Sequence, residues 1–279
     1  MQKKSRISIL GCGWLGLELA KTFIKNGFEV KGSATSQEKL PVLRGEGIDS
    51  YLVHFAEDEI PHLQDFLDSD ILIIAIPPGR KNPDGNSNYR MMADILTRKL
   101  PKSKINRVIL ISSTSVYGDP NKIVTEADEP KPDTDSAKLL IEVEKQFMLL
   151  KDKEIIVVRP GGLIGDDRYP GRFFSGKNEI ENGLAPVNLI HKTDITGIVY
   201  TLALAENASG IYNAVAPHHP TKNEFYSLAA FQVGLAPPNF LEEKTDWKIV
   251  NSHRIPHELT YEFIYPNLNQ WLKTSEFML

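Results

Sequence analysis

The chain has 279 residues, of which 41% are hydrophobic and 24% are charged, and its formal net charge is −4 at pH 7. These values are typical of a folded globular protein and exclude a disordered one. The negative balance provides no electrostatic footprint for nucleic acid or for an anionic membrane surface, so we expect neither as a partner.

The first residues carry no signal for export. They are basic, but the apolar run behind them, Ile7 to Leu10, is too short for the hydrophobic region of a signal peptide. No segment approaches the ~20 apolar residues of a membrane span. The single cysteine, Cys12, has no internal partner for a disulfide. We therefore expect a cytoplasmic protein.

The first predicted strand, Ile7 to Leu10, runs directly into residues 11–16, Gly-Cys-Gly-Trp-Leu-Gly, which have the GxGxxG spacing of dinucleotide-binding loops. In such a loop the first glycine allows a tight turn and the second lets the backbone approach a pyrophosphate. The third lets the following helix pack on the strand. Leu15, Leu19 and Phe23 then recur at helical spacing. The start of this helix offers free N–H groups to phosphates.

The end of the second predicted strand, near Ala34, bears on the choice of cofactor. An acidic side chain there would bind the adenosine ribose and repel a 2′-phosphate, but no acid occupies this place. Hydroxyl groups of Ser33, Thr35 and Ser36 stand there instead, and Lys39 follows. This pattern favours NADP. NAD stays open, because Lys39 also fits a solvated helix position.

Strands and helices alternate over about the first 160 residues, which predicts a doubly wound α/β fold of the Rossmann type. The stretch Ile71 to Ile76 is apolar throughout, as a central strand buried on both faces would be. The predicted strands are Ile7 to Leu10, Glu29 to Ala34, Ser50 to Val53, Asp70 to Ile76, Arg107 to Ser112 and Glu154 to Arg159.

The composition changes after Arg159, where loops rich in glycine and proline begin. We predict that residues 1–160 form the dinucleotide-binding domain. Residues 161–279 are predicted to form a smaller carboxyl-terminal substrate-binding lobe, partly interleaved with the first domain.

A cluster of hydroxyl residues, Ser-Ser-Thr-Ser-Val-Tyr-Gly over residues 112–118, follows the fifth predicted strand. Strand carboxyl ends carry the ligands in such sheets, so this cluster belongs on the ligand side. Serines at strand ends also cap turns, and that alternative stays open. For Thr114 and Ser115 we favour turn capping.

These features resemble the extended branch of the short-chain dehydrogenase/reductase superfamily, over nearly the whole chain. The resemblance is closest to the atypical, NAD(P)-dependent group of nucleoside-diphosphate-sugar epimerase/dehydratase-like proteins, which includes the YeeZ-like proteins. Besides the glycine loop and the hydroxyl cluster, it rests on Ile76-Pro77-Pro78-Gly79, Arg159-Pro160-Gly161-Gly162 and Ile190-His191-Lys192-Thr193-Asp194.

The resemblance implies that Ser113 is the catalytic serine, whose hydroxyl binds the reacting oxygen. It implies that Lys138 binds the nicotinamide ribose, for which a solvated surface lysine is the alternative. The cofactor-binding residues that it implies are Gly11, Gly13, Trp14, Leu15, Gly16, Ile76, Pro77, Pro78, Lys138 and Pro160.

The chain departs from the family at the catalytic tyrosine. The family's YxxxK pair places a phenol and an ammonium on one helical face, where the lysine lowers the pKa of the tyrosine. The matching stretch here runs from Thr134 to Lys138, so only the lysine matches. We interpret Thr134 as a helix cap. Tyr117 is our candidate for the missing acid, and a packing tyrosine with a locally bonded hydroxyl is the alternative.

Arg168 and Arg172 resemble the arginines with which extended members face their substrates. An arginine fork suits phosphate or carboxylate groups, which points to an anionic substrate, although solvated arginines are the alternative. Arg80 and Lys81 are weaker candidates for binding phosphates.

The histidines give no metal site. We interpret His191 and Asp194 as structural residues that fix the second lobe. His218 and His219 are adjacent and lack accompanying ligands, so we expect no metal.

We therefore expect an NAD(P)-dependent oxidoreductase or epimerase/dehydratase that transfers hydride on a small, anionic or nucleotide-sugar-like substrate. The competing hypothesis is a dinucleotide-binding sensor that has lost the catalytic tyrosine. A homodimer is compatible with both.

Overall fold

The computed structural model describes residues 5–57, 59–79 and 85–274. The chain divides into two compact units, each assembled from separate stretches. Unit 1 comprises residues 1–113, 132–159 and 199–211, and unit 2 comprises residues 114–131, 160–198 and 212–279. The chain therefore passes between the units several times, and one of these crossings lies between Arg159 and Pro160.

A seven-stranded sheet forms the centre of the fold, with strand order β10-β7-β5-β4-β1-β2-β3. Every pair from β7 across to β3 is parallel. This order confirms the doubly wound α/β fold. The strands are β1 Arg6–Leu10, β2 Glu29–Ala34, β3 Asp49–Leu52, β4 Ile71–Ile74, β5 Arg107–Ile111, β7 Glu154–Pro160 and β10 Gly210–Ala214.

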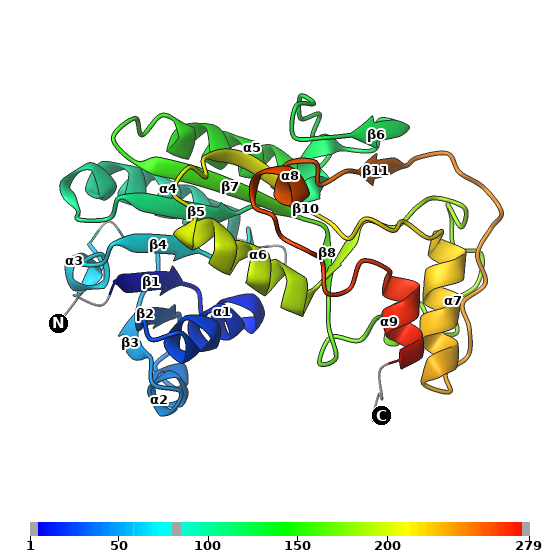
Figure 1. The fold of residues 1–279 in the computed structure, drawn as a ribbon, viewed down its shortest axis with the longest axis horizontal. Helices are drawn as coiled ribbons and strands as arrows, with labels where there is room; N and C mark the ends of the chain where they lie inside the picture. Colours follow the sequence, from blue (N-terminus) through cyan, green and yellow to red (C-terminus); the bar gives the residue numbers. More distant parts are fainter. Residues whose placement is uncertain (1–4, 58, 80–84, 275–279) are drawn as a thin grey trace. The chain divides into compact units, whose positions relative to one another are not determined.

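Helices cover both faces of this sheet, with α4 and α5 on one face and α1 on the other (Figure 1). In α1 the residues Leu15, Leu19 and Phe23 are buried as their spacing predicted. Strand β4 is buried along its whole length, because helices lie above and below it. The helices from α1 to α6 are α1 Trp14–Lys25, α2 Lys39–Gly45, α3 Leu63–Phe66, α4 Gly85–Lys99, α5 Asp135–Met148 and α6 Lys192–Leu204.

The six predicted strands are all present, and their ends differ from the prediction by at most two residues. The largest difference is at β4, which ends at Ile74 instead of Ile76. Pro77 and Pro78 follow, and proline has no N–H for a strand ladder. Strand β10 was not predicted.

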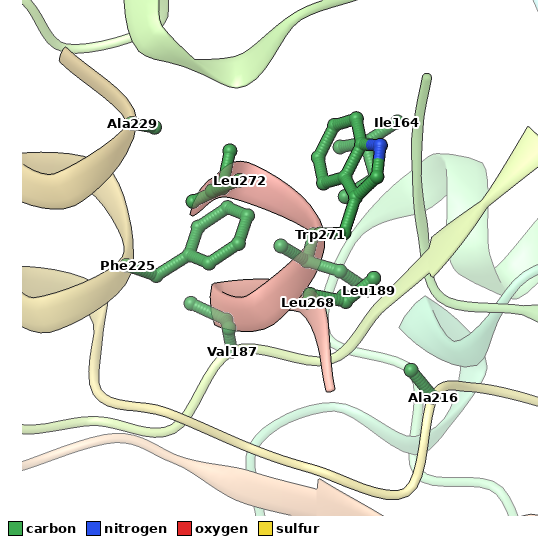
Figure 2. Close-up of a cluster of buried hydrophobic side chains, with 9 residues drawn as sticks. All are labelled: Ile164, Val187, Leu189, Ala216, Phe225, Ala229, Leu268, Trp271 and Leu272. Carbon is green, nitrogen blue, oxygen red and sulfur yellow. The ribbon is translucent and has the colours of Figure 1, made fainter. Parts of the chain in front are cut away.

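Unit 2 contains two small parallel sheets, β6 with β11 and β8 with β9. Its core gathers around Trp271 and Phe225, where helices α7 and α9 face each other (Figure 2). The remaining elements are β6 Lys122–Val124, β8 Gly162–Ile164, β9 Leu189–His191, β11 Lys248–Val250, α7 Lys222–Gln232, α8 Arg254–Glu258 and α9 Leu268–Thr274.

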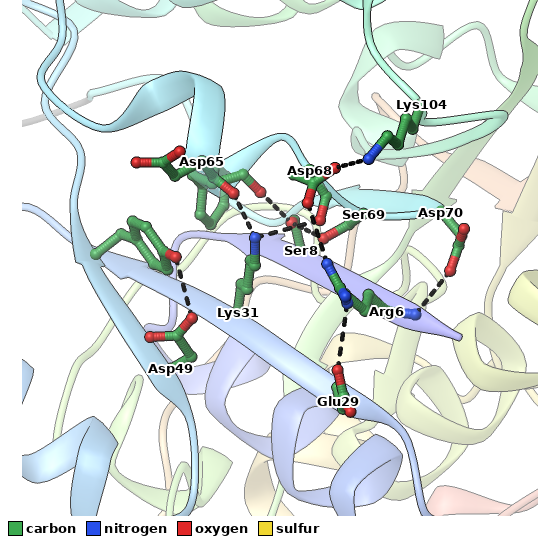
Figure 3. Close-up of polar contacts among 12 residues, drawn as sticks. Arg6, Ser8, Glu29, Lys31, Asp49, Asp65, Asp68, Ser69, Asp70 and Lys104 are labelled. Carbon is green, nitrogen blue, oxygen red and sulfur yellow. Dashed lines mark hydrogen bonds and ion pairs between the residues drawn. The ribbon is translucent and has the colours of Figure 1, made fainter. Parts of the chain in front are cut away.

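Charged side chains tie together the amino ends of the strands in unit 1 (Figure 3). The Arg6 guanidinium contacts Glu29 at 3.2 Å and Asp68 at 3.0 Å. Lys104 contacts Asp68 at 2.8 Å and holds the pKa of that carboxyl below its usual range. These side chains are substantially exposed, so each pair adds at most modestly to stability. Their effect is to fix β1 at the end opposite the glycine loop.

A buried polar cluster in unit 1 joins β5, α5 and β7. Arg159 and Glu144 are 2% and 3% exposed. Arg159 Nη2 lies 2.6 Å from Glu144 Oε2, and its Nε donates to Oε1 at 3.2 Å. The Ser112 hydroxyl also donates to Glu144 Oε1. Because both charges are desolvated, each depends on the other for compensation.

We predict that Glu144→Leu lowers the free energy of unfolding by about 3–5 kcal/mol, because it leaves the Arg159 guanidinium buried without a counter-charge. The double variant Glu144→Leu/Arg159→Met should recover most of this loss. Glu142→Leu is the control, because Glu142 lies on the exposed face of the same helix as Glu144 and pairs with Arg90 of α4. Its loss should cost less than about 1 kcal/mol. Urea denaturation measures all three, and equal losses for Glu144→Leu and Glu142→Leu would contradict the assignment.

Candidate dinucleotide site

The three glycines of the loop between β1 and α1 differ in the space around them. A Cβ on Gly11 would lie 2.3 Å from Ile76 Cγ2, and Gly11 has φ +94°. A Cβ on Gly16 would lie 2.1 Å from the Gly11 carbonyl oxygen. A Cβ on Gly13 would meet nothing within 4 Å. Packing within unit 1 therefore requires the first and third glycines, whereas the second faces open space.

The loop is fastened to β2 by Ser33. Gly11 N–H donates to Ser33 Oγ at 2.9 Å, and Cys12 N–H donates to the Ser33 carbonyl at 2.8 Å. Ser33 is only 2% exposed, so its hydroxyl holds the loop in place. Burial raises the pKa of the Cys12 thiol to about 12, which keeps it protonated and unreactive.

The turn from β2 into α2 contains an acid that our reading of the sequence did not include. Glu38 stands at the N-cap of α2. Its pKa is lowered by a hydrogen bond from its own backbone N–H and by one from the Ser36 hydroxyl. Thr35 and Lys39 are exposed beside it. In the sequence, Glu38 stands four positions after Ala34. The family's acid stands at the end of the second strand, so this position was not considered.

The chain leaving β4 packs closely against the loop. Ile76 is the side chain that limits space at Gly11, Pro77 is exposed and Pro78 is buried. A Cβ on Gly79 would lie 2.4 Å from the Gly85 Cα, so the two backbones touch where α4 begins. Arg80 and Lys81 lie outside the described residues.

The residues of the hydroxyl cluster differ in how deeply their side chains are buried. Ser112 is bonded to Glu144, as described above, and Thr114 is buried in the 3-10 turn Thr114–Tyr117. Ser113 is half-buried and is the second residue after the end of β5. The carboxyl end of a central parallel strand is where ligands of this fold class bind.

Tyr117 is 1% exposed in unit 2, and its hydroxyl donates to Asn213 Oδ1 at 2.9 Å. The Asn213 amide donates in turn to the Asn251 carbonyl at 3.1 Å. Glu126 Oε1 accepts the Asn213 backbone N–H at 3.1 Å. This arrangement has the geometry of the alternative that we left open, a packing tyrosine with its hydroxyl bonded locally.

The start of α5 shows what replaces the family's tyrosine. Thr134 is the N-cap, and its hydroxyl accepts the Ala137 N–H at 3.2 Å. This confirms the predicted capping role. Lys138 is exposed, and its Nζ lies 3.3 Å from Asp135 Oδ1.

The remaining predicted residues lie in unit 2. Pro160 ends β7, Arg168 closes the turn that begins at Gly165, and Arg172 ends the 3-10 turn Pro170–Arg172. Both arginines are exposed. The predicted set thus divides, with the glycine loop, Ser33, Thr35, Ser36, the segment 76–78, Ser113 and Lys138 in unit 1 and the others in unit 2.

His191 and Asp194 are structural, as predicted. Asp194 accepts N–H groups of Ile264 at 2.7 Å and Tyr265 at 3.0 Å, and the Tyr261 hydroxyl at 3.1 Å. Burial lowers the pKa of His191 to about 4, so the ring is neutral near pH 7. Its Nδ1 accepts the Thr193 N–H at 3.2 Å. The pair fixes the chain that leads into α9.

The described residues contain neither a membrane-spanning helix nor a cluster of metal ligands. No helix in this part of the chain is long and apolar enough to cross a membrane. No group of three or more His, Cys, Asp or Glu side chains among these residues is placed to hold a metal ion.

Comparison with known proteins identifies the family to which the chain belongs. It is 37% identical to protein YeeZ of Escherichia coli (strain K12) over 267 residues, which cover 94% of this chain and 97% of that protein. The chain belongs to the YeeZ family. No family model matches it. This membership confirms the resemblance to the YeeZ-like proteins.

Solved structures share the fold of this YeeZ-family chain at low sequence identity. A conserved protein of unknown function from Silicibacter pomeroyi matches with TM-score 0.78 and 20% identity, over 97% of each chain. Human epimerase family protein SDR39U1 with NADPH gives 0.75 and 18%, over 96% of this chain and 98% of that one. Bordetella bronchiseptica WbmG with NAD and UDP gives 0.75 and 16%, over 94% and 90%.

We predict that Thr134→Ala lowers the free energy of unfolding by about 1 kcal/mol, because the Ala137 N–H loses its acceptor. Thr134→Ser, which keeps the hydroxyl, should restore stability. Thermal unfolding compares the three proteins. If Thr134→Ala were as stable as the parent and instead weakened dinucleotide binding, Thr134 would belong to the site and not to the cap.

Proposed function

We propose that this protein binds a nicotinamide dinucleotide on the loop of residues 11–16 and uses it in hydride transfer of the epimerase/dehydratase type. The observation that carries the proposal is the open space at Gly13. The other two glycines of the loop, Gly11 and Gly16, are tightly packed and have no room for a side chain. Protein packing alone would tolerate a side chain at Gly13. A ligand that approaches the backbone there gives a physical reason for glycine.

The start of α1 suits a pyrophosphate. The helix has twelve residues, no acidic side chain in its first turn and no side-chain cap. The N–H groups of this first turn form the positive end of the helix dipole, which favours an anion. Residues 13–16 would hold the phosphates, with Ile76 and Pro78 beside them and Lys138 toward the ribose. The nicotinamide ring, when bound, supplies a hydride donor or acceptor.

The choice between NAD and NADP falls on the turn between β2 and α2. Thr35 and Lys39 favour the 2′-phosphate of NADP, which remains our preferred cofactor. The Glu38 carboxylate opposes a second negative charge. SDR39U1 was solved with NADPH and WbmG with NAD, so this fold accommodates either cofactor.

We assign to Ser113 the binding of the reacting substrate oxygen, because a hydroxyl group near the end of β5 can both donate a hydrogen bond to this oxygen and accept one from it. Arg168 and Arg172 are the proposed contacts for an anionic group of the substrate, since guanidinium forks bind phosphate and carboxylate well. The presence of UDP in the WbmG structure is consistent with a nucleotide-sugar-like substrate. Tyr117 is not given the proton-transfer role here, because its hydroxyl is bonded to Asn213.

A second candidate function is a dinucleotide-binding sensor without turnover. Two observations favour it. The residue in place of the catalytic tyrosine, Thr134, is occupied in capping α5, and Tyr117 is buried. Fold alone does not carry catalysis.

We predict that Gly13→Ala raises the dissociation constant for NADH and NADPH at least tenfold, about 1.4 kcal/mol, because the added methyl group fills the space of the pyrophosphate. The protein should fold normally, since the methyl group meets no protein atom. Gly45→Ala is the matched control, because a Cβ there also meets nothing within 4 Å. Isothermal titration calorimetry measures both variants, and unchanged affinity in Gly13→Ala would contradict the site.

A screen for NADH or NADPH oxidation over UDP-sugars and small carbonyl acids separates the two functions. For an active substrate, Ser113→Ala should lower kcat at least a hundredfold without changing dinucleotide affinity. Tyr117→Phe should keep turnover within about twofold and cost about 1 kcal/mol of stability from the lost hydrogen bond. A large loss of kcat in Tyr117→Phe would make Tyr117 the proton donor. Tight dinucleotide binding without turnover on any substrate would establish the sensor.

A further inference from the structure

Two exposed histidines in unit 2 stand one helical turn apart on α8. His253 is the N-cap residue of this helix and already has helical dihedral angles, φ −67° and ψ −43°. His257 follows four residues later, and both side chains are exposed. Their ring centroids are 4.7 Å apart, with an angle of 41° between the ring planes.

This geometry matches that of two imidazoles on one metal ion. At metal–nitrogen distances of ~2.0–2.1 Å, two imidazoles bound to the same ion have ring centroids roughly 5 Å apart. The i, i+4 spacing on a helix is the one that brings two histidine ligands to a single ion. The separation of the His253 and His257 rings is therefore compatible with binding to a single ion.

The charges around the pair do not oppose a cation. Arg254 lies between the two histidines in sequence, but its guanidinium donates to both carboxylate oxygens of Glu258, at 2.6 Å each. It also stacks 4.0 Å over the ring of Tyr212. Glu258 thus offsets the positive charge of its neighbour.

We propose that His253 and His257 form a surface site for a late first-row divalent cation, with Cu²⁺ the tightest ligand. Imidazole is a preferred ligand of Cu²⁺, Ni²⁺ and Zn²⁺, and Cu²⁺ heads the affinity order for nitrogen ligands. The two histidines supply two coordination positions, and water fills the others. This site is independent of the proposed dinucleotide site, which lies in unit 1.

Calorimetric titration of the full-length protein without an affinity tag, with CuCl₂, NiCl₂ and ZnCl₂, tests the site. We expect one Cu²⁺ per chain at this site, bound more tightly than Ni²⁺ or Zn²⁺. His253→Gln and His257→Gln should each weaken Cu²⁺ binding at least tenfold. The double variant should not bind Cu²⁺ more weakly than the single variant with the lower affinity. Because both rings are exposed, the melting temperature should not change.

The matched control is His218→Gln/His219→Gln, which removes two histidines that are adjacent and not one turn apart. It should leave Cu²⁺ affinity within twofold of the parent protein. Electron paramagnetic resonance of the Cu²⁺-loaded parent should show two coordinated imidazole nitrogens, which needs no variant. Unchanged affinity in His257→Gln, an equal loss in the control, or a spectrum without two nitrogens would overturn the proposal.

Discussion

The turn between β1 and α1 depends on close backbone packing at Gly11 and Gly16, where no space is left for a side chain. A Cβ on Gly16 would lie 2.1 Å from the Gly11 carbonyl oxygen, and one on Gly11 would collide with Ile76. Ser33 then fastens the turn to β2 through two hydrogen bonds. This close packing places the start of α1 against the carboxyl end of β1. The candidate dinucleotide site follows from that placement.

The same contacts separate the two glycines that packing requires from the one that it does not require. Substitution of Gly11 or Gly16 would disturb the fold itself, because backbone or core atoms lie in the way. Gly13 has no such neighbour, so protein packing does not require glycine there, and we attribute this glycine to the proposed ligand. A GxGxxG motif in a sequence does not reveal this difference; the space around each Cβ does.

The strands of the sheet could be predicted from the sequence, because the patterns that mark a strand lie within a few consecutive residues. An apolar run such as Ile71 to Ile76 and the glycine loop depend on neighbours in the chain. The Thr134 cap was also readable, since it bonds an N–H three residues away. Long-range pairings were not readable. Tyr117 meets Asn213 across 96 residues, and the strand β10 that contains Asn213 was missed. Glu38 and the His253–His257 pair were overlooked because each lies outside the positions that the family pattern marks.

Dinucleotide binding is the central claim, because the proposed chemistry depends on it. A crystal structure of the protein with bound NADH or NADPH tests it most directly. We predict pyrophosphate oxygens within hydrogen-bond distance, ~3 Å, of the N–H groups at Gly13 and the first turn of α1. A dinucleotide bound elsewhere, or none at saturating concentration with the loop unchanged, would contradict it.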